Sequence, residues 1–154
     1  MQLLVQGIST DHADHLRRGG LDANHQPPVR TRAEGGRNPC RHCLGLIAPG
    51  DPMLVLAYRP FAAPQPYAEV GPVFVHADAC RRYRDAALPA WFAHLTPALI
   101  RGYDARDWIV YPTGAVVAGP ELADRARAIL ADPAVAYVHV RSQFNCFQAR
   151  IERG

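Results

Sequence analysis

The sequence contains no lysine, so all 17 of its Lys and Arg positions are arginine. Guanidinium groups favour bidentate contacts with carboxylates and phosphates, which would suit an anionic partner. The net charge is only +3, however, and Asp78 and Asp85 flank the arginine cluster at positions 81, 82 and 84. We therefore attribute the arginine excess to coding preference and do not expect a nucleic-acid partner.

Long apolar runs are also absent. No run approaches the roughly 20 residues that a helix needs to span a bilayer. The first residues, Met1 to Gly7, lack the basic start and the long apolar core of a secretory signal. We therefore expect no membrane partner and a cytoplasmic location, where thiols stay reduced.

What is present predicts a globular protein. The chain has 154 residues, of which 49% are hydrophobic, and this is enough to bury a core and to exclude wholesale disorder. We expect a single domain over residues 1–154. Within it, glycine and proline punctuate residues 19–39 and apolar residues are sparse there, which predicts a mobile surface loop.

The hydrophobic pattern predicts an α+β fold with a mainly antiparallel sheet and a few helices. Pro120 and Glu121 are typical of a helix start, and the apolar residues that follow share one helical face. Alternation over residues 134–141 and 147–151 predicts a hairpin. Further strands are expected at Leu3–Val5, Met53–Tyr58, Val73–Val75, Leu99–Tyr103 and Trp108–Tyr111, and short helices near Asp14 and Trp91.

Two residue pairs have the spacing of metal ligands. Cys40 and Cys43 form a C-x2-C pair, and His76 and Cys80 form an H-x3-C pair 32 residues later. Zinc takes four nitrogen or sulfur ligands in a tetrahedron, and four protein ligands close a site for a structural role. We expect a helix that begins near residues 76–78 and continues past Cys80 to residue 84, because ligands four apart then share one face.

Such a Cys3His site with zinc carries a net charge of about −1, because all three thiols ionise. Four arginines lie close enough in sequence to offset this charge: Arg37, Arg41, Arg81 and Arg82.

Three alternatives remain open for the same residues. Cys40 and Cys43 could be a redox pair, although the Gly45 and Pro49 that follow do not favour the helix that such a pair requires. All the cysteines could be ordinary buried thiols, with His76 as a core histidine. His42, inside the first pair, could replace His76 as a ligand, although the interior of such a turn usually points outward.

Cys146 offers a different chemistry. His139 lies across the expected hairpin, and Arg141 and Arg150 are near in sequence. A thiol beside an imidazole and guanidinium groups can become a reactive thiolate, so the alternative function is a small enzyme that uses Cys146 and His139. An idle or buried thiol is the competing interpretation.

Several segments resemble an uncharacterised bacterial family, domain of unknown function 1203, from about Pro39 onward. The residues that carry the resemblance are Pro39-Cys40-Arg41, Pro49-Gly50, Leu54–Tyr58, Pro66–Glu69, Gly71–His76, Arg101–Ala105, and Ala136–Val140 leading to Cys146. The resemblance implies no known activity.

The order of features between Cys40 and Tyr83 also resembles a treble-clef zinc finger: a C-x2-C turn, a hairpin, and H-x3-C on a helix. Together these observations predict a cytoplasmic binding domain with a structural zinc ion.

Overall fold

The structure is a computed structural model that describes residues 1–154. The chain forms two compact units, and each is described by itself. The large-sheet unit comprises Met1–Gln6, Ala63–Ala68 and Arg84–Gly154, and the small-sheet unit comprises Gly7–Ala62 and Glu69–Tyr83. Whether both units fold together as one domain, as the sequence suggests, stays a prediction. No helix is long and apolar enough to cross a membrane.

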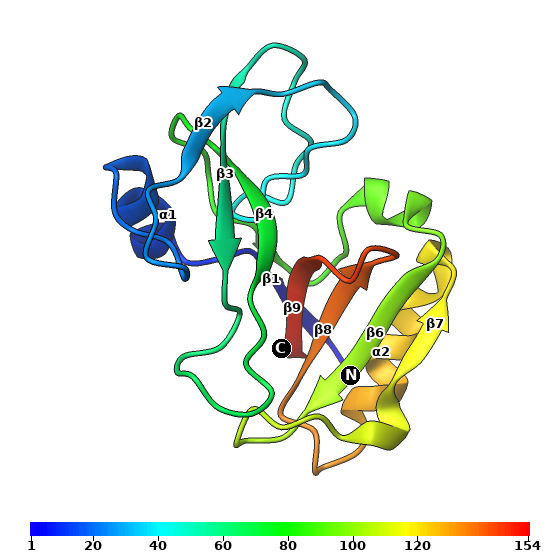
Figure 1. The fold of residues 1–154 in the computed structure, drawn as a ribbon. Coiled ribbons are helices and arrows are strands. Elements are labelled where there is room, and N and C mark those ends of the chain that lie inside the picture. Colours follow the sequence, from blue (N-terminus) through cyan, green and yellow to red (C-terminus); the bar gives the residue numbers. More distant parts are fainter. The chain divides into compact units, whose positions relative to one another are not determined.

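The large-sheet unit is built on a six-stranded sheet with the order β5-β1-β9-β8-β6-β7. Figure 1 labels all of these strands except the two-residue β5. All neighbouring strands are antiparallel. The predicted hairpin is confirmed, because β8 pairs with β9 and His139 lies opposite Arg150. The strand bounds are Leu3–Gln6 for β1, Arg84–Asp85 for β5, Ala98–Tyr103 for β6, Ala115–Val117 for β7, Tyr137–Ser142 for β8 and Phe147–Arg153 for β9.

Helix α2, Leu122–Leu130, packs on β6 and follows the short 3-10 helix η3, Gly119–Glu121 (Figure 1). Its predicted apolar face is buried, with Leu122, Ala126 and Leu130 fully inside the protein. Burial of this face is the main source of the helix's stability, because a helix of this length is marginal by itself.

The strand predicted at Trp108–Tyr111 is wrong. Only Ile109 makes an isolated bridge, to Tyr103, and a 3-10 helix, η2, covers Tyr111–Thr113. The Asp104 carboxylate accepts hydrogen bonds from the backbone amides of Arg106 and Trp108, which closes a tight turn in place of a strand. The short helix expected near Trp91 is a 3-10 helix, η1, at Ala90–His94.

The small-sheet unit holds a three-stranded antiparallel sheet with the order β2-β3-β4. Its strands are Val29–Arg32, Pro52–Tyr58 and Gly71–His76, and the last two confirm the predicted apolar strands. Helix α1, Thr10–Arg17, begins as expected: the Ser9 hydroxyl accepts a hydrogen bond from the His12 amide at 3.2 Å.

The prediction of an unbroken loop over residues 19–39 is wrong at β2. All four residues of β2 are exposed, so this edge strand has no apolar alternation from which it could be recognised. The loop before it is tied to β3, because the Asp22 carboxylate accepts a hydrogen bond from the Ala57 amide at 2.9 Å. The mobility of this loop stays a prediction.

The helix predicted from residues 76–78 onward does not form, which is the main correction to the sequence analysis. Residues 77–83 have no regular structure, and β5 begins at Arg84. Their backbone makes distant bonds in place of helical ones: the Tyr83 amide donates to the His42 carbonyl at 2.9 Å, and the Gly7 amide donates to the Tyr83 carbonyl at 3.0 Å. A treble clef ends in a helix, so the likeness to that finger is limited to the turn and the hairpin.

Candidate metal centre

The first pair of candidate ligands lies on a tight turn. The Cys40 amide donates to the Gly45 carbonyl at 2.9 Å, and the Leu44 amide donates to the Cys40 carbonyl at 2.8 Å. Leu44 has a φ of 53°, in the left-handed region that few side chains adopt. The turn, residues 40–45, is called the knuckle below. It buries Cys40 completely and leaves Cys43 half-buried.

The hairpin brings the second pair to the knuckle. His76 is the last residue of β4, and Cys80 follows in the irregular segment. The knuckle lies along β4, because the Arg41 amide donates to the Phe74 carbonyl at 2.8 Å. The His76 amide donates to the sulfur of Cys40 at 3.3 Å. Contacts between the knuckle and β4 therefore bring His76 to Cys40 without a helix.

The four predicted ligands converge. One ligand atom from each of Cys40, Cys43, His76 and Cys80 lies within 4.8 Å of every other. The sulfurs of Cys40 and Cys80 are 3.9 Å apart, and Cys43 Sγ is 3.5 Å from His76 Nδ1. A tetrahedral zinc ion with ordinary bond lengths places two sulfurs about 3.8 Å apart and a sulfur and a nitrogen about 3.5 Å apart. The group can therefore hold a metal ion.

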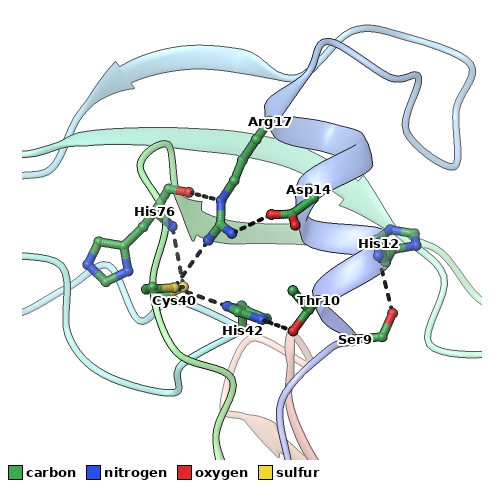
Figure 2. A network of polar contacts seen from close by, with 9 residues as sticks. Ser9, Thr10, His12, Asp14, Arg17, Cys40, His42 and His76 are labelled. Carbon is green, nitrogen blue, oxygen red and sulfur yellow. Dashed lines mark hydrogen bonds and ion pairs between the residues drawn. The ribbon is translucent and has the colours of Figure 1, made fainter.

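A second set of side chains surrounds Cys80, and the sequence spacing did not point to it. Its sulfur receives a hydrogen bond from Arg17 Nη2 at 3.1 Å and lies 3.1 Å from His42 Nδ1. Figure 2 shows Arg17 reaching from α1 toward the cysteines, between Asp14 and the His76 carbonyl. Arg17 donates to these two groups at 3.0 and 3.1 Å.

His42 is not a member of the four-residue group. Its ring is completely buried, which contradicts the expectation that the interior of the turn points outward. The 3.1 Å between its Nδ1 and Cys80 Sγ is shorter than the roughly 3.5 Å between two ligands of one zinc ion, and fits a hydrogen bond. Its other nitrogen, Nε2, lies 3.0 Å from Thr10 Oγ1 (Figure 2).

The contacts among the three thiols shift their pKa values in opposite directions. A hydrogen bond from Cys43, assisted by one from Cys80, lowers the pKa of Cys40 far below its ordinary value. The same contact with Cys40 raises the pKa of Cys43, and Cys40 likewise raises the pKa of Cys80. A bound divalent cation would ionise all three thiols.

An arginine that the sequence analysis did not name contacts a sulfur of the group directly. Arg41 donates to the Pro39 carbonyl at 2.7 Å, and Arg82 donates to the Gly7 carbonyl at 3.0 Å. Arg17, which donates to a ligand sulfur, lies 63 residues from Cys80 in the sequence, so no local motif indicates it.

The conformation of the knuckle does not favour the interpretation of Cys40 and Cys43 as a redox pair. A thioredoxin-type pair places its first cysteine at the start of a helix. Cys40 instead lies on a turn and is completely buried.

The Cys146 and His139 candidates lie in the large-sheet unit. His139 is completely buried, with its ring centroid 4.6, 5.0 and 4.9 Å from those of Tyr103, Tyr137 and Phe147. Burial lowers the pKa of His139 well below its ordinary value, and nearby arginines add to this effect. Cys146 lies in the loop between β8 and β9, where its thiol donates to the Phe144 carbonyl at 3.9 Å. The aromatic surroundings favour a packing role for His139.

Comparison with curated proteins and with solved structures finds no match. One family of proteins of unknown function, DUF1203, matches residues 37–153. The matched region contains all four residues of the Cys3His group and leaves α1 outside. The chain therefore belongs to the DUF1203 family.

Proposed function

We propose that Cys40, Cys43, His76 and Cys80 bind one zinc ion. The observation that carries this proposal is the spacing of the ligand atoms, 3.9 Å between two sulfurs and 3.5 Å between a sulfur and a nitrogen. Both separations match the edges of a tetrahedron around zinc. Three thiolates and one imidazole are also a ligand set that suits zinc better than magnesium, calcium or manganese.

The zinc ion serves a structural role in this proposal. Four protein ligands complete the tetrahedron, so no position is left for a water molecule or a substrate. The ion would join the knuckle to the end of β4 and to the irregular segment that holds Cys80. Small units with a limited core gain much of their stability from such a link.

The remaining parts of the proposal concern what the protein does and where. A closed metal site does no chemistry by itself, so we infer that the protein acts by binding another molecule. Three metal-binding thiols must stay reduced, and this supports a cytoplasmic location.

Metal analysis tests the proposal. The full chain is expressed in zinc-supplemented cells, purified without chelator and analysed for metal content. We expect about one zinc ion per chain, and Cys43→Ser should lose it. Cys146→Ser is the matched control and should keep it, because Cys146 lies outside the Cys3His group. A wild-type protein that carries no metal would rule the proposal out.

A further inference from the structure

Both ends of helix α1 reach the sulfur of Cys80. Arg17, the last residue of α1, donates directly to Cys80 Sγ at 3.1 Å. Thr10, the first residue, reaches it through His42: Thr10 Oγ1 lies 3.0 Å from Nε2, and Nδ1 lies 3.1 Å from the sulfur. Two side chains, those of Arg17 and His42, thus contact this single sulfur atom directly.

The Arg17 side chain is held in place by groups other than the Cys80 sulfur. Only 9% of it is exposed, and its guanidinium also contacts Asp14 Oδ1 at 3.0 Å and the His76 carbonyl at 3.1 Å. A guanidinium fixed in this way presents its Nη2 group to the sulfur with little further loss of side-chain entropy.

The chemistry of a metal-bound thiolate fixes the tautomer of His42. A thiolate on zinc can only accept hydrogen bonds, so His42 Nδ1 must carry the proton. Nε2 is then an acceptor, and the Thr10 hydroxyl donates to it. With this tautomer, the hydroxyl of Thr10 donates to His42 and His42 donates to the sulfur, so both hydrogen bonds form at once (Figure 2).

We propose that Arg17 and His42 are positioning residues of the metal centre, whose hydrogen bonds hold the sulfur of Cys80 in its place among the ligands. This inference rests on the proposed zinc site. Zinc with three thiolates and one imidazole carries about one negative charge, and the Arg17 guanidinium lies against it. Partners of this kind, next to metal ligands, typically contribute 10- to 100-fold in metal affinity.

Cobalt(II) binding to the full chain tests the proposal, because cobalt occupies zinc sites and reports on its ligands. Affinity is measured by competition with a chelator, and the sulfur-to-cobalt charge-transfer band is recorded in the near ultraviolet. We expect Arg17→Gln to weaken binding about 10- to 100-fold. The band should move to longer wavelength, because a thiolate without its donor gives up an electron more easily.

Matched variants separate this role from a merely structural one. Arg17→Lys keeps a donor and a charge, so it should restore part of the affinity and of the band position. Arg18→Gln removes the same charge from the adjacent exposed residue and should behave as wild type. His42→Asn, which keeps an N–H group near the position of Nδ1, should bind cobalt more tightly than His42→Ala.

The outcomes are distinguishable. If wild type binds cobalt and Arg17→Gln and His42→Ala match it in affinity and spectrum, the positioning role is wrong and the metal site stands. If wild type binds neither zinc nor cobalt, both proposals fail. Should Arg17→Gln not fold, cobalt binding by Thr10→Val is measured in its place. This substitution removes only the hydroxyl group that contacts His42 Nε2, away from the sulfurs. Weaker cobalt binding supports the proposal, and unchanged binding refutes the contribution of His42.

Discussion

The Nδ1 atom of His76 lies 3.5 Å from the sulfur of Cys43, although 33 residues separate the two in the sequence. The contact depends on the register of β3 with β4, in which Met53 lies opposite His76. It also depends on the knuckle, which lies along β4 at Phe74. Two local structures, each stabilised by its own backbone hydrogen bonds, thus place the four side chains close together.

Zinc should stabilise the folded protein by an amount that grows with the logarithm of the free zinc concentration. A ligand that binds only the folded state at 1,000 times its dissociation constant adds about 4 kcal/mol to the free energy of unfolding. We therefore expect the midpoint of thermal unfolding to fall when a strong chelator replaces zinc. The midpoint of thermal unfolding of Cys80→Ser should be the same with zinc as with the chelator. Equal midpoints for wild type with zinc and with chelator would contradict this prediction.

Gly7 is required where the chain passes the knuckle. A Cβ atom at this position would lie 2.1 Å from the carbonyl oxygen of His42 and 2.7 Å from that of Arg41. Because both neighbours are backbone atoms, Gly7→Ala must displace the knuckle, and overpacking of this kind costs about 1–3 kcal/mol. Urea unfolding measures this cost, and the variant should also bind zinc more weakly.

Gly71→Ala is the control for this prediction. Gly71 begins β4, and a Cβ atom there meets no atom within 4 Å. The free energy of unfolding should change by less than about 0.5 kcal/mol. A Gly7→Ala variant as stable as Gly71→Ala would show that the close approach at the knuckle is not required.

His139 should make the protein less stable as the pH falls below about 6.5, the ordinary histidine pKa. Burial lowers its pKa in the folded state, and Arg141, Arg150 and Arg101 lower it further. Below pH 6.5 His139 therefore binds a proton in the unfolded chain but stays neutral in the folded protein. The contribution of His139 to the free energy of unfolding is present above pH 6.5 and is lost toward lower pH, with a slope of at most about 1.4 kcal/mol per pH unit.

The measurement is urea unfolding between pH 7.5 and pH 5, on wild type and on His139→Phe. Phenylalanine suits the aromatic surroundings and does not titrate, so the variant should show a shallower pH dependence than wild type. Two parallel curves would mean that His139 is protonated equally in the folded and unfolded states. His12 and His42, whose pKa values burial also lowers, contribute equally to both proteins.

Leu130 tests the core of the large-sheet unit. It is completely buried at the end of α2, so Leu130→Ala should cost about 2–5 kcal/mol through lost burial and the cavity left behind. Val116→Ala on β7 is the control, because Val116 is 66% exposed and should change stability by less than about 0.5 kcal/mol. Comparable losses for the two variants would contradict the assigned packing of α2.

The sequence correctly predicts those elements that depend on a local pattern of residues. The apolar face of α2, the alternation in β8 and β9, and the C-x2-C turn each indicate a structure that forms. The helix after His76 is the instructive failure. Helical spacing of His76 and Cys80 suggests it, but Tyr83 pairs with His42 and Gly7, and such distant backbone bonds leave no trace in local sequence.

The side chains that surround the candidate metal centre could not be predicted from the sequence either. Arg17 and Thr10 meet Cys80 and His42 only because α1 packs beside the knuckle, where the Ile8 amide donates to the Arg41 carbonyl at 2.8 Å. The sequence therefore predicts the ligands, whose chemistry is distinctive, and not the arginine next to them, whose residue type is common in this chain.

X-ray absorption spectroscopy of the zinc-loaded protein tests the central claim most directly, because it reports the type and distance of the atoms bound to zinc. A shared site predicts three sulfur atoms at about 2.3 Å and one nitrogen at about 2.0 Å. A zinc ion surrounded only by nitrogen and oxygen, or a sulfur count that stays the same in Cys80→Ser, would show that these four residues do not share a metal.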